Sequence, residues 1–248
     1  MNIILFEKDE LDDGHVFLRD HRAKHIVKIL HSTIGDSVRI GMIGGPVGTG
    51  KIVQLESKYP FLVDLLVSVS EKPVPAPAID LLLALPRPIM LKRILSQVTA
   101  LGVGKIFIIN ANRVEKSFWE AGILDSVEYR PHLIQGLEQA VDTRLPEILI
   151  SRSFKDFAEQ KLPAMAGDYR HLLLAHPGAK KSLSACIAMH GKAGRVLYAI
   201  GPEGGWVDFE LEKFAHSGMH TFSVGARILK VDTAVVAIHS RISQALEQ

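Results

Sequence analysis

Short apolar runs separated by glycine-rich turns make up the first part of the chain. Three of these runs alternate like strands, and one segment near the start has a helical period: Ser37–Ile43, Lys51–Glu56 and Phe61–Val69, with the helix near Arg22–His31. Strands joined by such turns predict a small, mostly β domain.

A proline-rich segment follows this β-like part. Glu71–Ala78, EKPVPAPA, holds three prolines in eight residues, a composition typical of an extended linker. We therefore expect two domains, 1–72 and 73–248.

Beyond the linker, β-like runs alternate with helical ones. In chain order they are Ile79–Leu85, Met90–Leu101, Lys105–Ile109, Leu124–Ala140, Leu172–Ala175, Val196–Ile200, Asp208–His216 and Thr221–Val224. Because parallel strands need crossover connections, this alternation predicts an α/β domain with a parallel sheet flanked by helices. The last segment, Asp232–Leu246, has one apolar face and predicts an amphipathic closing helix: Ala234, Ala237, Ile238, Ile242 and Ala245.

Composition indicates an ordinary packed protein. Apolar residues are 47% and charged residues 23% of the 248. The net charge of +2 does not indicate nucleic acid, so any RNA-binding surface must be a local patch. The single cysteine, Cys186, excludes an internal disulfide and fits a reducing compartment. With no signal-peptide pattern and no membrane-length apolar run, we expect a cytoplasmic protein.

One glycine-rich stretch has the spacing of a nucleotide phosphate loop. Gly45–Lys51, GPVGTGK, matches that spacing, but Ile52 stands where the motif needs a Ser or Thr hydroxyl, and the following residues alternate like a strand. The sequence therefore favours a hairpin turn over an ATPase site.

Two other glycine-containing loops lie in the last fifty or so residues. Ala199–Trp206, AIGPEGGW, separates a β-like run from a helix, and Val224–Thr233, VGARILKVDT, leads into the closing helix. Glycine permits backbone paths that other residues obstruct, so such loops can wrap closely around a ligand. Open α/β sheets bind ligands at loops after neighbouring strands.

These loops resemble those of the RsmE family of bacterial 16S rRNA uridine-N3 methyltransferases. GPEGG and the G-x-R-I-L run are similar to the family's paired signature, and LAHP at Leu174–Pro177 is similar to a third family loop. The resemblance extends to four further places: Leu101–Val103, Glu138–Gln139, Arg144–Glu147 and the basic helix His21–Leu30.

The resemblance implies a C-terminal SPOUT α/β trefoil-knot domain and a small N-terminal PUA-like β-barrel. It also implies that S-adenosyl-L-methionine is bound by the three loops. The residues carried over as cofactor-binding are Leu174, His176, Pro177, Ile200, Gly201, Pro202, Glu203, Gly204, Gly205, Val224, Gly225, Ile228 and Leu229. The implied partners are small-subunit ribosomal RNA and a second copy of the chain, with Asp232–Leu246 in the contact, and no metal or membrane.

Methyl transfer from a sulfonium requires the acceptor nitrogen to lie in line behind the methyl group. Uridine N3 carries a proton at neutral pH, so a base or a stabiliser of the developing anion helps. We assign Arg227 to the RNA phosphate or the uracil oxygens, and Lys230 to a further positive charge. Glu203 either serves the reaction or caps the helix that starts near Asp208, and Asp232 is expected to be the N-cap of the last helix.

The resemblance implies that a basic cluster in the first domain contacts RNA phosphates, whereas composition alone favours an ordinary solvated helix surface. Together with one residue of the R-L-P-E motif, the residues assigned to RNA are Arg19, Arg22, Lys24, His25, Lys28 and Arg144. A solvated helix face is the alternative for this cluster.

The sequence departs from the family pattern at several positions: Met90, Lys92, Asp142, Thr143, Lys230 and Asp232. The cofactor loops keep the family pattern better than the RNA-facing positions do. Two other functions stay open. One is a SPOUT enzyme that acts on ribose 2′-hydroxyls or on tRNA, and the other is a non-catalytic RNA-binding protein.

Overall fold

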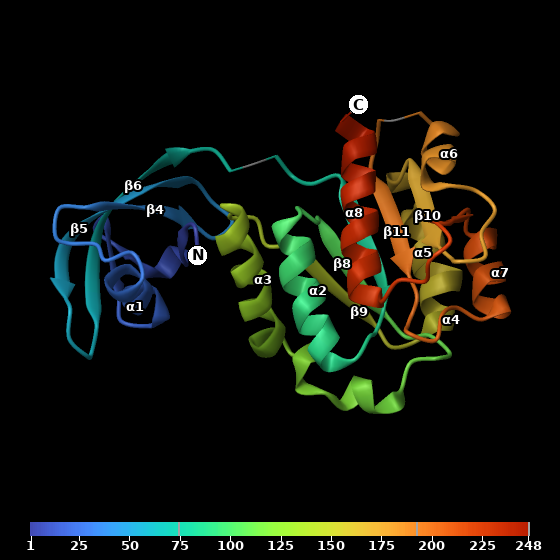
Figure 1. Cartoon of the computed structure of the whole chain (residues 1–248), viewed down its shortest axis with the longest axis horizontal. Coiled ribbons are helices and arrows are strands. Elements are labelled where there is room, and N and C mark those ends of the chain that lie inside the picture. The colour runs from blue at the N-terminus through green and yellow to red at the C-terminus, as the bar shows by residue number, and fades with distance from the viewer. Residues whose placement is uncertain (74, 192, 248) are drawn as a thin grey trace. The chain divides into compact units, whose positions relative to one another are not determined.

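The structure, a computed structural model, describes residues 1–73, 75–191 and 193–247 (Figure 1). The chain divides into two compact units. The first is Met1–Pro75 with Ile134–Leu145, and the second is Ala76–Leu133 with Pro146–Gln248. The linker expected at Glu71–Ala78 includes Val74, which lies outside the described residues.

The first unit is built on a six-stranded sheet in the order β1-β4-β5-β6-β3-β2. Its strands are β1 (Ile4–Phe6), β2 (Leu11–Asp12), β3 (His15–Leu18), β4 (Ser37–Met42), β5 (Val47–Glu56) and β6 (Leu62–Glu71). β1 pairs in parallel with β4, and the other pairs are antiparallel. Two register shifts in β5, at Val47/Gly48 and Ile52/Gln54, bend this long strand as β-bulges do.

Helix α1 (His21–Lys28) packs on this sheet. The Asp20 carboxylate caps the helix by accepting the Arg22 N–H at 2.8 Å. The apolar face of α1 supplies Ala23, Ile26 and Val27 to a core with strand residues such as Ile40 and Leu65. The Arg22 side chain is only 12% exposed and pairs with Glu10 and Asp20, so it ties α1 to the start of the chain.

The end of helix α3 (Ser126–Ala140) belongs to the first unit as well. Leu137 is fully buried in a small cluster with Ile3, Leu5 and Val47. The Thr143 hydroxyl also donates to the Gly45 carbonyl at 2.7 Å. A segment far along the chain therefore completes the core of this unit.

The second unit contains a six-stranded, all-parallel sheet in the order β12-β10-β11-β7-β8-β9. Its strands are β7 (Ile79–Ala84), β8 (Lys105–Ile109), β9 (Glu147–Ser151), β10 (His171–Ala175), β11 (Val196–Ile200) and β12 (His220–Phe222). The chain runs outward from β7 to β9 and returns to fill the other side. The strand order therefore reverses between β7 and β11, the kind of position where such sheets bind ligands.

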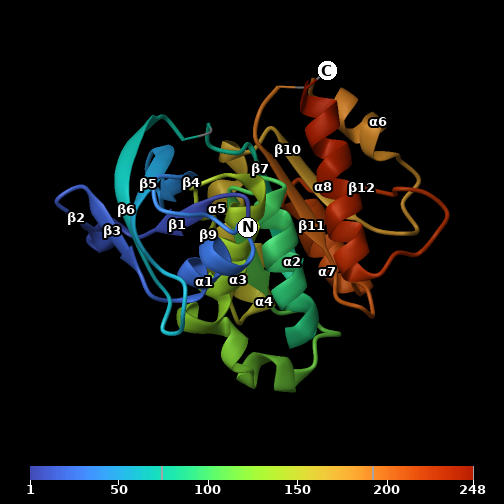
Figure 2. The same cartoon turned by 60° about the vertical axis from the view of Figure 1, so that its left-hand side comes forward.

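Helices cover both faces of this sheet (Figure 2). On one face lie α2 (Pro88–Ala100) and α8 (Val231–Glu247), which contact each other. On the other, α7 (Asp208–His216) and the helical segment 154–165 pack Phe214, Phe157 and Leu162 against the strands. The remaining elements are short: η1 (Lys8–Glu10), η2 (Lys116–Glu120), η3 (Gly122–Leu124), α4 (Phe154–Asp156), η4 (Phe157–Lys161), α5 (Leu162–Met165), η5 (Ala166–Asp168) and α6 (Leu183–Ala188).

Most strands and helices lie within a few residues of where the sequence predicted them. β8, β11 and α7 match their predicted bounds. β1, β3 and β9 were not predicted, and neither was the helical segment 154–165. On α8 the fully buried apolar residues are Val231, Val235, Ile238 and Ile242, whereas the alanines assigned to the buried face are half-buried.

Candidate active site

A cavity of about 780 Å³ lies at the carboxyl ends of β10, β11 and β12. Three loops that follow these strands line it, together with residues after β7 and β8. Twelve of the thirteen residues predicted to bind a cofactor are in its wall: His176, Pro177, Ile200, Gly201, Pro202, Glu203, Gly204, Gly205, Val224, Gly225, Ile228 and Leu229. The fold thus brings together loops up to about fifty residues apart in the sequence.

Leu174 is the exception. Its side chain is 1% exposed and packs in the main core of the second unit, while the next residues, Ala175 and His176, line the cavity. Successive side chains of a strand point to opposite faces, and Leu174 belongs to the strand rather than the loop. The Leu174 side chain therefore points away from the cavity, and binding of the cofactor by the main chain of this residue stays a prediction.

The loop 201–205 is shaped by a tight turn. The Gly205 N–H donates to the Pro202 carbonyl at 2.8 Å, and Gly205 has a φ of +74°, a left-handed conformation that favours glycine. At Gly201 a Cβ would lie 3.1 Å from the Trp206 ring. The indole therefore occupies the space beside this glycine.

Glu203 is held by the loop after β7. Its Oε1 accepts the Arg87 N–H at 3.3 Å, and the side chain is exposed at the cavity. Helix α7 is capped by Glu210 instead, whose Oε2 accepts the Val207 N–H at 2.9 Å. The alternative in which Glu203 caps this helix is therefore wrong.

Arg227 and Lys230, the other two residues assigned to catalysis, lie exposed on the loop that leads into α8 and line the same cavity. Asp232 does not occupy the cap position, because α8 begins at Val231. It lies in the first turn, where its Oδ1 accepts the Thr233 N–H at 2.9 Å. A carboxylate there still complements the positive end of the helix dipole.

Charge at the cavity is mostly positive. Arg87 and Arg113 join Arg227 and Lys230 in the wall, where Glu203 is the one acidic side chain among the residues that line it. The exposed rim can therefore hold an anionic group such as a phosphate. Neither Arg87 nor Arg113 was predicted as a site residue.

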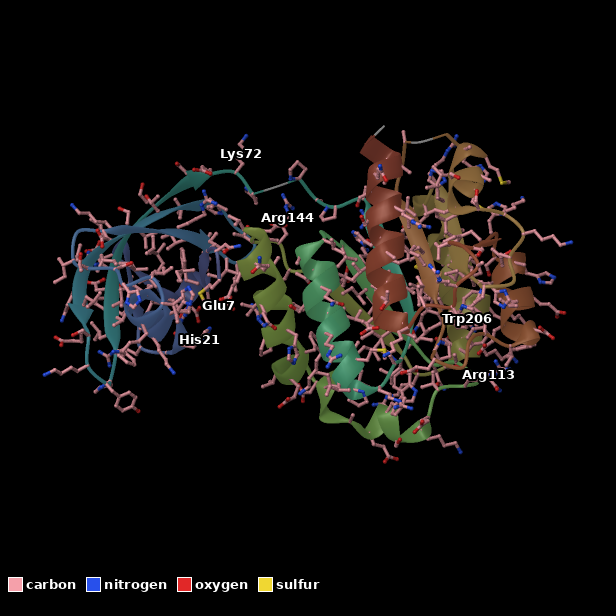
Figure 3. The ribbon with its side chains drawn as sticks, in the orientation of Figure 1. Glu7, His21, Lys72, Arg113, Arg144 and Trp206 are labelled. Atoms are coloured by element: carbon pink, nitrogen blue, oxygen red, sulfur yellow. The ribbon has the colours of Figure 1, made fainter. Side chains whose placement is uncertain are left out.

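Arg113 and Trp206 are site residues that the sequence analysis missed (Figure 3). Arg113 comes four residues after β8 and donates from Nη1 to the Gly204 carbonyl. Trp206 follows the GPEGG motif, is 5% exposed, and packs edge-on against Phe214 with ring centroids 5.0 Å apart. An arginine in a loop after a strand was the available signal for Arg113, but nothing local links it to a loop ninety residues away.

The basic cluster of the first unit is only partly free to bind RNA. Arg19, Lys24 and Lys28 are exposed, but all three donor nitrogens of Arg22 are bonded, to Leu5, Glu10 and Asp20. Burial lowers the pKa of His25, which disfavours its charged form. Arg144 is half-buried after α3.

The phosphate-loop alternative is wrong. Gly45 and Pro46 lie in the turn between β4 and β5, and Lys51 pairs with Ser37 at the end of that hairpin away from the turn. A phosphate loop must instead open a helix whose first amides face the anion. The hairpin interpretation is confirmed.

In the described part of the chain, no group of three or more His, Cys, Asp or Glu side chains is placed to hold a metal ion. Among the same residues, no helix has the length and apolar character to cross a membrane.

Comparison with known proteins agrees with this site. Residues 72–243 match a family described as an RNA methyltransferase domain. Ribosomal RNA small subunit methyltransferase E of Treponema pallidum is 33% identical over 96% of this chain and 88% of its own length. Ribosomal RNA small subunit methyltransferase E 1 of Borreliella burgdorferi is 27% identical over 96% of this chain and 95% of its own length. The chain belongs to the RsmE family of rRNA methyltransferases, as its motifs predicted.

Solved structures share the fold. A methyltransferase of Legionella pneumophila, in complex with S-adenosylmethionine, has a TM-score of 0.77 at 19% identity and covers 98% of this chain and 97% of its own. A small subunit methyltransferase E of Neisseria gonorrhoeae, also bound to S-adenosylmethionine, has a TM-score of 0.74 at 19% identity with the same coverage.

Proposed function

We propose that this protein transfers a methyl group from S-adenosyl-L-methionine to N3 of a uridine in the 16S rRNA of the small ribosomal subunit. The observation that carries the proposal is a single cavity walled by the loops after β10, β11 and β12 and rimmed by four cationic side chains. Membership of the RsmE family supports the same reaction.

The cavity suits S-adenosylmethionine. Its volume of about 780 Å³ lies in the range of pockets that enclose small ligands. Glycines in two of the loops expose main-chain groups that can bond a ligand, and the buried Trp206 Nε1 has no hydrogen-bond partner among the described residues, so a ligand group is expected to satisfy it. When bound, the donor supplies an electrophilic methyl group on a positively charged sulfur.

We assign three tasks to the side chains at the cavity rim: they hold the nucleotide, stabilise the developing anion and accept the proton. Arg227 and Lys230 hold the nucleotide by its phosphate or uracil oxygens, so that N3 points at the methyl group. As N3 loses its proton, negative charge spreads onto the uracil oxygens. The same cations stabilise this charge. The exposed Glu203 carboxylate accepts the proton.

We assign residues 1–72 to a PUA-like RNA-binding barrel and residues 73–248 to a SPOUT trefoil-knot domain. The register shifts of β5 support the barrel, because bulges curve a sheet toward closure. The path after the edge strand β12 supports the knot, since the chain returns from this edge to α8, which contacts β11 and β7 near the middle of the sheet.

We assign the RNA contacts of the first unit to the exposed cations Arg19, Lys24 and Lys28, and also to His25 and Arg144. Arg22 supports the helix that carries them through its ion pairs. We further propose that the protein acts in the cytoplasm as a homodimer, with α8 in the contact. Both assignments rest on family membership.

The decisive experiment is nucleoside mass spectrometry of small-subunit rRNA from cells with and without this gene. We expect one N3-methyluridine to disappear without the gene, to return with the wild-type gene, and to stay absent with Arg227→Ala. Loss of a ribose methyl or a tRNA methyl instead would identify the other SPOUT activity. Absence of heat on titrating the protein with S-adenosylmethionine would identify a non-catalytic RNA-binding protein.

A further inference from the structure

Two loops that follow non-adjacent strands are joined beside the cavity. β7 separates β8 from β11 in the sheet, yet the loop after β8 reaches the loop after β11. The buried Glu210 carboxylate bonds both, accepting the Asn112 N–H at 2.7 Å and the Val207 N–H at 2.9 Å. This bridge places the next residue, Arg113, against the GPEGG turn.

Arg113 contacts Gly204 in two ways. Its Nη1 donates to the Gly204 carbonyl, and its aliphatic part covers the Gly204 α-carbon so closely that an added Cβ would lie 2.9 Å from Arg113 Cδ. A side chain at position 204 would thus displace the arginine. The position of Arg113 therefore requires a glycine at position 204.

The peptide group between Gly204 and Gly205 is consequently fixed at both ends. Its carbonyl accepts from Arg113, and its N–H donates to the Pro202 carbonyl at 2.8 Å. Glycine peptides rotate easily, because no side chain restricts them. Without Arg113 only the internal turn bond would hold this one, in the loop that lines the cavity.

We propose that Arg113 is a positioning residue for the methyl donor: by fixing the Gly204–Gly205 peptide group, it holds the loop in its binding conformation before the donor arrives. This inference rests on the proposed function. A preorganised loop avoids an ordering cost on binding. Arg113 therefore acts on donor affinity through Gly204.

The test is calorimetric titration of the full-length protein with S-adenosylmethionine and with its demethylated product, beside thermal unfolding. We expect Arg113→Ala to weaken both affinities at least about ten-fold, the effect of losing one charge-assisted hydrogen bond, with little change in Tm because Arg113 is exposed. Arg113→Lys, which keeps a charged donor, should recover part of the loss. Arg93→Ala, an exposed arginine on α2, is the matched control and should bind as the wild type does.

A double-mutant cycle isolates the contact with Gly204. Gly204→Ala should weaken donor binding in the wild-type background, because its methyl group displaces Arg113, and should cost little more in the Arg113→Ala background. Additive effects, or an Arg113→Ala variant that binds the donor normally and loses only RNA affinity, would overturn the inference. Failure of the wild type to bind the donor would instead reject the proposed function.

Discussion

Asp80 is fully buried at the start of β7, where a carboxylate without partners would be strongly destabilising. Four donors satisfy it: Nε and Nη2 of Arg195 and the Lys105 N–H at 2.7 Å, and the Tyr169 hydroxyl at 2.6 Å. The pair with Asp80 also raises the pKa of Arg195. This network closes the end of the sheet opposite the cavity, so its role is structural.

His239 on α8 is the clearest pH-sensitive residue of the second unit. It is 1% exposed, and burial lowers its pKa to about 4. Nε2 lies 3.2 Å from the Leu101 carbonyl and Nδ1 lies 3.3 Å from the Tyr198 hydroxyl. A neutral ring protonated on Nε2 satisfies both partners, whereas a second proton on Nδ1 would remove the acceptor for Tyr198.

We expect His239 to make the free energy of unfolding depend on pH. Its pKa is lower in the folded protein than the unfolded value of about 6.5, so its contribution is complete above pH 6.5 and is lost as the pH falls toward 4. The loss is roughly 3 kcal/mol. Urea unfolding at several pH values should show the advantage of wild type over His239→Gln narrowing in that window. A difference that stays constant with pH would contradict this.

At the level of elements, the loops carry the function and the strands only place them. Three strand ends converge on one cavity, whose wall combines loop glycines and exposed cations with buried apolar residues such as Trp206 and Phe222. The GPEGG turn is constrained by its backbone, because Gly205 adopts a positive φ. No heavy atom lies within 4 Å of the position of an added Cβ there, so backbone conformation alone requires the glycine.

Gly205→Ala should therefore strain the loop without a steric clash. We expect a cost of about 1 kcal/mol, the usual penalty of a left-handed non-glycine residue, and weaker binding of S-adenosylmethionine as the turn relaxes. Gly167→Ala is the control, since Gly167 also has open space around it but no positive φ. Donor titrations and Tm values of the two variants should differ; equal results would show that the turn tolerates a side chain.

At the scale of the whole molecule, the units do not follow the chain in order. Residues 134–145 complete the core of the first unit, although the sequence analysis placed them in the second domain. Leu137 is fully buried there among Ile3, Leu5 and Val47. Helix α3 is thus shared: its first half belongs to one unit and its second half to the other.

Leu137→Ala should destabilise the first unit by roughly 2–4 kcal/mol, because it leaves a cavity in a packed core. Differential scanning calorimetry should show the loss in the transition of that unit. Val127→Ala, a 77% exposed residue at the start of the same helix, serves as control and should change little. A Leu137→Ala variant as stable as the control would show that the segment is not needed for the core.

The sequence determined most of the elements and the residues of the cofactor loops, because hydrophobic period and glycine placement act over a few residues. Of the thirteen residues predicted to bind the cofactor, twelve line the cavity; the exception is Leu174, the penultimate residue of β10, whose side chain lies in the core. Short pieces such as β1 were missed because three residues carry too little period.

Tertiary structure alone decided which segments remote in the sequence contact each other. The order of the strands, the assignment of 134–145 to the first unit and the grip of Arg113 on Gly204, 91 residues away, have no local signal. Each depends on the packing of segments that are remote in sequence. There the free energy gained by burying whole apolar surfaces outweighs the conformational preference of any one residue.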